Sequence, residues 1–130
     1  MSKPAGHHTV TPYLMLRGAA DAIEFYKRAF GATELMRQQD PEGGIQHAEI
    51  LIGDSPVMLV DETPKFPEMR GVQTFGGSPV NMFLYVDDAD AWVKRAVEAG
   101  ARIVMEVSDQ SYGRSGGVKD PFGLDWWICS

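Results

Sequence analysis

A histidine and a glutamate stand two residues apart in "IQHAEILIG", a segment whose apolar residues alternate as in a β-strand. Side chains two residues apart on a strand share one face, so His47 and Glu49 point the same way. Glu49 could act there as a general base, with His47 as its partner or as a metal ligand. Burial would raise the pKa of the carboxyl group and favour that role. The alternative is a hydrogen-bonded pair that only positions neighbouring strands.

Two adjacent tryptophans close the chain in "DPFGLDWWICS". Asp-Pro-Phe-Gly is typical of a turn, and Asp-Trp-Trp-Ile-Cys is typical of a strand. Neighbouring strand residues face opposite sides of a sheet. One indole can therefore fill the core, while the other must face a different surface.

Composition limits the classes of function. The 130 residues suit one compact domain, and 44% are hydrophobic and 23% charged. The net charge is −6 and no basic stripe is present, so we expect neither nucleic acid nor a membrane as partner. No signal peptide or long apolar run is visible, which favours a cytoplasmic location.

Other reactive residues give weaker signals. Cys129 is the one cysteine, which excludes an internal disulfide and a cysteine-cluster zinc site. No glycine-rich nucleotide motif and no Ser-His-Asp arrangement is visible. We expect His7 and His8 to lie in a frayed N-terminal segment, where they could form a fortuitous metal-binding pair.

An internal repeat organises the chain. The segment "YLMLRGAADAIEFYKRAFGATELM" starts at Tyr13, and "MFLYVDDADAWVKRAVEAGARIVM" starts at Met82, about 70 residues later. Each has a short apolar strand and then a helix with apolar residues at 3–4 residue spacing. Gly31 and Gly100 end the two helices. The pattern indicates a duplicated supersecondary module.

Three further strands follow each helix, so each module is βαβββ. We expect them at Thr33–Gln38, Ile45–Ile52 and Pro56–Asp61, and at Arg102–Val107, Gly117–Lys119 and Leu124–Cys129. The chain is predicted to be a single domain over residues 1–130. Its first module covers about residues 9–61, a Pro- and Gly-rich linker about 62–79, and the second module about 80–130.

Four segments carry a family resemblance: "TPYLMLRGAADAIEFYKRAFGA", "IQHAEILIGDSPVMLVDE", "YVDDADAWVKRAVEAGA" and "YGRSGGVKDPFGLDWWI". They resemble the vicinal oxygen chelate superfamily of glyoxalases, extradiol dioxygenases and fosfomycin- and bleomycin-resistance proteins. The PhnB-like branch is the most similar, although Leu124 stands where that branch often has histidine. The resemblance implies an α+β fold in which the two βαβββ modules form a cup-shaped half-barrel with flanking helices.

The resemblance also locates the usual metal site. Alignment by the turns places the ligand positions of the metal enzymes at or next to Thr11, Met58, Asn81 and Trp127. These are poor ligands for a divalent metal, so we expect no metal and no other cofactor there. In the same alignment Trp126 packs beneath the helices and Trp127 faces the cup.

The residues expected to bind a ligand in the cup are aromatic or polar: Tyr13, Met58, Asn81, Phe83, Tyr85, Arg114 and Trp127. Aromatic walls with a few polar groups are typical of a small-molecule pocket. The alternative is that these side chains fill the barrel or pack at a dimer interface. Arg114 lies in a segment expected to be a loop at the cup's mouth. It could bind a carboxylate or phosphate there, or be an ordinary surface arginine.

These patterns predict a glyoxalase/bleomycin-resistance-type protein that binds a small aromatic or cationic molecule without the usual metal. One alternative is a metal-dependent lyase, isomerase or dioxygenase that uses His47 and Glu49. Another is a structural dimer with a filled cup. Proteins of this resemblance are commonly homodimers, often with modules paired between chains, so we expect a homodimer.

Overall fold

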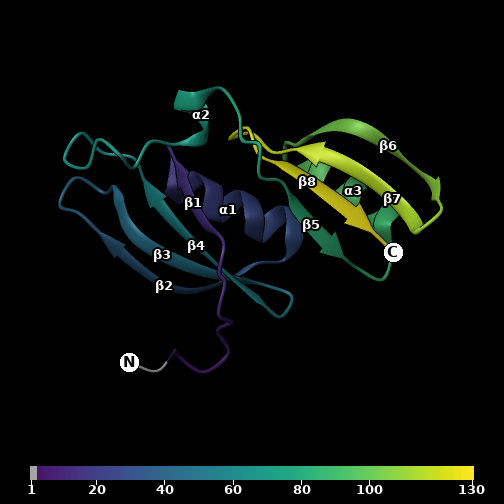
Figure 1. Cartoon of the computed structure of the whole chain (residues 1–130), viewed down its shortest axis with the longest axis horizontal. Coiled ribbons are helices and arrows are strands. Elements are labelled where there is room, and N and C mark those ends of the chain that lie inside the picture. Colours follow the sequence, from purple (N-terminus) through teal and green to yellow (C-terminus); the bar gives the residue numbers. More distant parts are fainter. Residues whose placement is uncertain (1–2) are drawn as a thin grey trace.

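Two four-stranded sheets stand side by side in a computed structural model that describes residues 3–130 (Figure 1). The elements follow the order β1 (Tyr13–Leu16), α1 (Ala19–Phe30), β2 (Thr33–Gln39), β3 (Ile45–Ile52), β4 (Ser55–Asp61), α2 (Val72–Phe75), β5 (Met82–Tyr85), α3 (Ala89–Ala99), β6 (Arg102–Gln110), β7 (Gly113–Lys119) and β8 (Asp125–Cys129). The first sheet has the order β1-β4-β3-β2 and the second β5-β8-β7-β6. Each half is βαβββ, so the predicted α+β fold with two such modules is confirmed.

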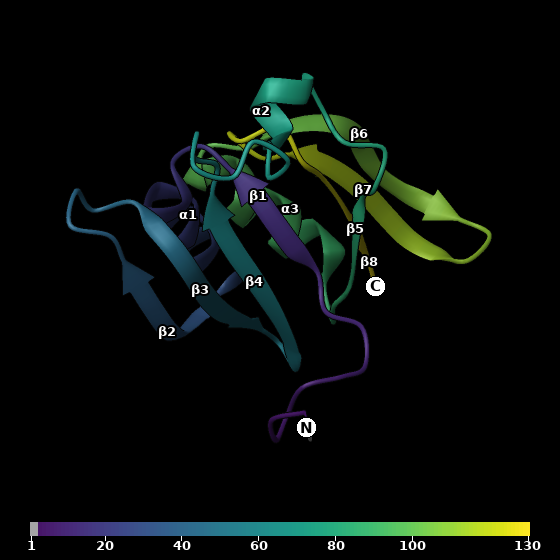
Figure 2. The ribbon, with the colours of Figure 1, turned by 60° about the vertical axis from the view of Figure 1, so that its left-hand side comes forward.

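Helices α1 and α3 lie against one side of the two sheets, and the opposite sheet faces carry neither helix (Figures 1 and 2). Helix α1 begins after Gly18, which has no side chain to cap it. Asp61 at the end of β4 supplies that cap, because its Oδ1 accepts the Ala19 N–H at 2.8 Å and its Oδ2 accepts the Ile45 N–H. The left-handed Gly31 ends the helix as predicted.

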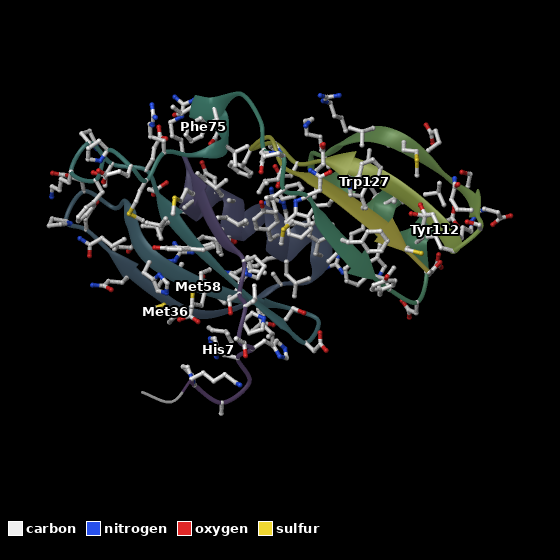
Figure 3. The ribbon with its side chains drawn as sticks, in the orientation of Figure 1. His7, Met36, Met58, Phe75, Tyr112 and Trp127 are labelled. Carbon is white, nitrogen blue, oxygen red and sulfur yellow. The ribbon has the colours of Figure 1, made fainter. Side chains whose placement is uncertain are left out.

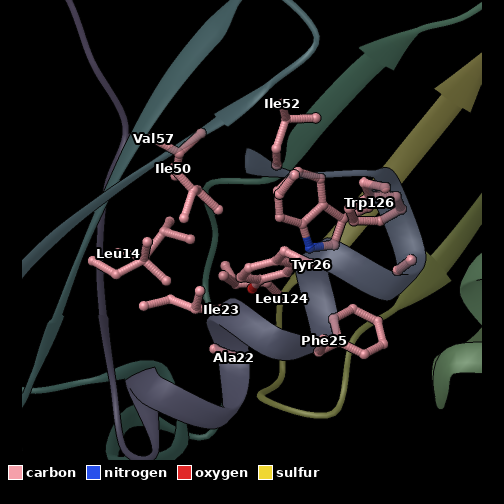
Figure 4. Close-up of a cluster of buried hydrophobic side chains, with 14 of the residues drawn as sticks. Leu14, Ala22, Ile23, Phe25, Tyr26, Ile50, Ile52, Val57, Leu124 and Trp126 are labelled. Carbon is pink, nitrogen blue, oxygen red and sulfur yellow. The ribbon is translucent and has the colours of Figure 1, made fainter. Parts of the chain in front are cut away.

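One hydrophobic core joins the two modules (Figure 4). From the second module, the buried Trp126 packs against Tyr26 and Phe30 of α1, with ring centroids 5.2 and 4.8 Å apart. From the first, Leu14 and Ile50 reach the same core. The expectation that Trp126 packs beneath the helices is therefore confirmed.

A buried carboxylate lies at the centre of this junction. Asp120 is 3% exposed, and its Oδ2 accepts hydrogen bonds from the Tyr26 hydroxyl at 2.6 Å and the Trp126 Nε1–H at 2.8 Å. Its Oδ1 accepts the backbone N–H groups of Phe122 and Leu124. Burial and the negative charge of Asp120 raise the pKa of Tyr26 well above its ordinary value, so this hydroxyl remains a donor.

The β6–β7 hairpin is longer than predicted. The strands expected at Arg102–Val107 and Gly117–Lys119 extend to Arg102–Gln110 and Gly113–Lys119. Gly116, which suggested a loop, lies inside β7. A Cβ at this position would stand 2.7 Å from the Val107 side chain. Close packing, rather than a turn, requires small residues here.

The linker between the modules contains the short helix α2, which the sequence did not predict. The Glu62 carboxylate accepts the Gly71 N–H at 2.6 Å and the Thr74 hydroxyl at 2.7 Å. The Gln73 side chain donates to the Arg17 carbonyl and accepts the Arg17 N–H. These bonds hold the linker beside β1. No helix within residues 3–130 has both the length and the apolar character needed to cross a membrane.

We predict that Asp120→Ala lowers the free energy of unfolding by about 3 kcal/mol or more, because two buried side-chain donors lose their acceptor. Denaturant titration measures this loss. Asp40→Ala is the matched control, since Asp40 opens the similar turn "DPEG" and accepts only local backbone N–H groups. We expect about 1 kcal/mol there. Equal losses in the two variants would contradict the role given to Asp120.

Candidate functional site

The helix-free face of each sheet carries the candidate site, and we call these faces the first and second half-cups. Strand register defines the first half-cup, since Tyr13 and Glu49 both lie beside Met58. In the second half-cup, Phe83 and Gly117 both lie beside Trp127. The seven expected ligand residues are therefore divided: Tyr13 and Met58 lie in the first half-cup, Asn81, Phe83, Tyr85 and Trp127 in the second, and Arg114 in neither.

Trp127 forms a fixed platform in the second half-cup (Figure 3). Its Nε1–H donates to Asn81 Oδ1 at 2.9 Å, on the β5 side of β8. On the β7 side, a Cβ at Gly117 would stand 2.5 Å from the six-membered ring. The indole is therefore held on the helix-free side of β8 between the Asn81 side chain and the backbone of Gly117. Only glycine at position 117 permits this approach.

Two more aromatic rings continue this surface along β5. The Phe83 and Tyr85 rings are 4.9 Å apart and inclined by 48°. Phe83 is 47% exposed and Tyr85 is 85% exposed. Since water rather than protein faces these rings in the single chain, they are available to a ligand or to another chain.

Arg114 lies apart from this surface. It stands on β7, where alternation turns its side chain away from the face that carries Gly117. Its Nε lies 2.6 Å from Asp90 Oδ2 at the start of α3, and its Nη1 lies 3.1 Å from Asp109 Oδ1. The guanidinium lowers the pKa of Asp90 by hydrogen bonding. The expected loop at the cup's mouth is thus a strand, and this arginine holds α3 instead of facing a ligand.

The first half-cup brings a third residue to the His47–Glu49 pair. His7 Nε2 lies 2.6 Å from Glu49 Oε1, while His47 Nε2 lies 3.4 Å from Oε2. The hydrogen bond from His7 is the largest influence on Glu49 and lowers its pKa, outweighing the opposing effect of burial. We expected burial to raise this pKa. Glu49 is instead a stabilised carboxylate and a weak base.

Sequence reasoning missed His7. The expected frayed segment is in place on the sheet, and the contact joins residues 42 positions apart. The adjacent His7 and His8 before the first strand give no periodicity or spacing that would indicate such a partner.

The metal positions of the superfamily hold unsuitable donors here. Met58 offers a thioether and Trp127 an indole, and the Asn81 carbonyl already accepts the Trp127 N–H. Within residues 3–130, no three His, Cys, Asp or Glu side chains are arranged to hold a metal ion. The residues at this position do not fit a divalent metal, which prefers oxygen or nitrogen donors in a converging set.

Two of the cavities beside the half-cups adjoin the linker. One of about 590 Å³ lies at the end of the first half-cup, between Tyr13, Val60 and the linker residues Phe66 and Met69. Another of about 520 Å³ lies between β1 and the β5 side, below α2. Both volumes suit a small molecule.

Comparison with protein families assigns the chain to a superfamily. Residues 7–128 match the model of the Glyoxalase/Bleomycin resistance protein/Dioxygenase superfamily. The chain belongs to this superfamily. The match covers both modules and confirms the resemblance inferred from the sequence.

Relatives extend this assignment. The Mycobacterium bovis protein Mb0911c is 42% identical over 120 residues, which cover 90% of this chain and 79% of the relative. The X-ray structure of the Arabidopsis thaliana At5g48480 gene product superposes with a TM-score of 0.79 at 31% identity, covering 95% of this chain and 98% of that one. A Bacillus cereus PhnB protein superposes with a TM-score of 0.71 at 16% identity, covering 94% and 98% of the two chains, and shows the shared fold alone.

We predict that Gly117→Ala displaces the Trp127 indole and destabilises the protein by about 1–3 kcal/mol, because the new methyl group overlaps the ring. Near-ultraviolet circular dichroism would report the displaced indole, and denaturant titration the energy. In a Trp127→Ala background the same change should be much less destabilising. An equal penalty in both backgrounds would show that the indole does not lie on Gly117.

Proposed function

We propose that the protein binds a small aromatic or cationic molecule and that Trp127 is the platform on which this molecule stacks. The observation that supports this most is the indole held between Asn81 and Gly117 on the helix-free face of β8. The exposed rings of Phe83 and Tyr85 lie on the same sheet face, and an exposed aromatic patch is typical of an interaction site.

The chemistry of the surface favours flat rings and cations. Aromatic stacking and cation–π contacts each contribute about 0.5–2 kcal/mol. Phe83 and Tyr85 extend the same surface, and Glu49 is an ionised carboxylate in the first half-cup. The net charge of −6 adds a field that attracts cations.

A second copy of the chain is the partner we propose for closing the cup. The first and second half-cups lie on separate sheets, and neither β1 nor β5 has a strand paired on its outer edge within residues 3–130. Unpaired edges favour association. If β1 of one chain lies beside β5 of the other, a two-fold axis satisfies both edges and joins a first half-cup to a second one.

We predict that Trp127→Ala weakens binding of an identified ligand about tenfold or more, since one stacking contact is lost. Ligands would be sought by quenching of tryptophan fluorescence with planar aromatic and quaternary ammonium compounds. Tyr112→Ala is the control, because Tyr112 is a 60% exposed aromatic residue at the β6–β7 turn. An unchanged dissociation constant in Trp127→Ala would refute the stacking role. If no compound binds, the aromatic surface is instead filled by protein.

We predict a dimer at micromolar concentration. Multi-angle light scattering of the purified chain measures this directly. Charged substitutions at Phe83 and Tyr85 on the second half-cup should shift the mass toward the monomer, whereas Tyr112→Glu should not. A monomeric mass for the unaltered chain would contradict the paired half-cups.

A further inference from the structure

The N-terminal segment, residues 3–12, holds one side chain against the first half-cup, and we call it the strap (Figure 3). A short turn closed by the His7 N–H and the Pro4 carbonyl directs His7 toward β3. The imidazole reaches Glu49 at 2.6 Å, and the two side chains are only 15% and 17% exposed. Most of the strap's other residues are exposed.

The surroundings of Glu49 are otherwise uncharged or aromatic. His47 lies 3.4 Å away on the same strand, and the Tyr13 ring of β1 meets the His47 ring edge-on at 5.9 Å. The neighbours of Glu49 on β2 and β4 are Met36 and Met58. Among the elements packed here, His7, His47 and Tyr13 are therefore the titratable groups that face this carboxylate.

We propose that Glu49 is a cation subsite of the first half-cup and that His7 occupies it until a cationic group of a ligand displaces the strap. This inference rests on the proposed binding function and names the part of the ligand that this half-cup receives. An ionised carboxylate in a half-cup that also carries the Tyr13 ring and the Met36 and Met58 thioethers suits an organic ammonium group, which gains Coulomb and cation–π attraction.

Displacement of His7 requires only a local change. Within the described chain, the His7–Glu49 contact is the hydrogen bond that ties residues 3–11 to the sheets. The next tie is the bond from the Met58 N–H to the Pro12 carbonyl, at the start of β1. A segment tied to the sheets by one hydrogen bond can open without disturbing the core. The strap can therefore leave Glu49 while β1 stays paired.

Protonation sets how strongly His7 competes. The hydrogen bond to Glu49 raises the pKa of His7, and the same bond lowers the pKa of Glu49. Both groups are charged between these two pKa values, so the strap is held most firmly there. As the pH rises through the raised pKa of His7, the imidazole loses its charge and Glu49 remains ionised. Affinity for a cation at Glu49 should increase over that range.

The test uses the full chain and benzyltrimethylammonium as probe, titrated calorimetrically at about pH 6 and about pH 9. At the lower pH, His7→Gln should bind the probe about fivefold tighter than the unaltered chain, since the His7–Glu49 ion pair no longer competes. His8→Gln, one residue along the strap, is the control and should change nothing. Glu49→Gln should abolish this binding, and the His7→Gln advantage should disappear at the higher pH.

Each outcome decides the proposal. Equal or weaker binding by His7→Gln would overturn it, and so would retained binding by Glu49→Gln with an unchanged melting temperature. Binding by His7→Gln alone would support it. A neutral planar probe, naphthalene, separates this result from the proposed function. If naphthalene binding depends on Trp127 while the ammonium probe ignores His7 and Glu49, the cation subsite is wrong and the stacking platform stands.

Discussion

Asp120 places a carboxylate in the interior within hydrogen-bonding distance of Tyr26 on α1 and Trp126 on β8. A buried charge is tolerated only where donors surround it, and four donors converge here. Tyr26 belongs to the first module, whereas Asp120 and Trp126 belong to the second. The same bonds therefore fix the turn between β7 and β8 and the position of α1 against both sheets.

The inward position of Trp126 determines the sheet face on which Trp127 lies. Because Trp126 is fixed beneath α1, alternation leaves Trp127 on the helix-free face. The neighbouring strands then supply a hydrogen-bond acceptor in Asn81 and, at Gly117, a position without a side chain that leaves room for the ring. The architecture of the second half-cup thus follows from the packing of the core, and the first half-cup faces the same side of the molecule with a different, partly charged set of groups.

Local patterns in the sequence were enough for most of the fold. The repeat, the helix-ending Gly31 and the alternation around His47 and Glu49 predicted both modules and the faces of their strands. Features that depend on contacts between residues far apart in the sequence were not predicted. Gly116 suggested a loop because the side chain that requires it to be small, Val107, lies on another strand. His7 gave no signal because its partner, Glu49, lies 42 positions away. The lowered pKa of Glu49 was not predicted either, since it results from this contact.

The platform in the second half-cup has an entropic consequence. An exposed tryptophan ordinarily samples several rotamers, and a ligand that stacks on it must pay for holding one of them. Here the N–H bond to Asn81 and the contact with Gly117 remove that freedom during folding, before any ligand arrives. The ring is preorganised, so binding loses little conformational entropy at Trp127, and a rigid flat molecule would meet a surface that is equally rigid.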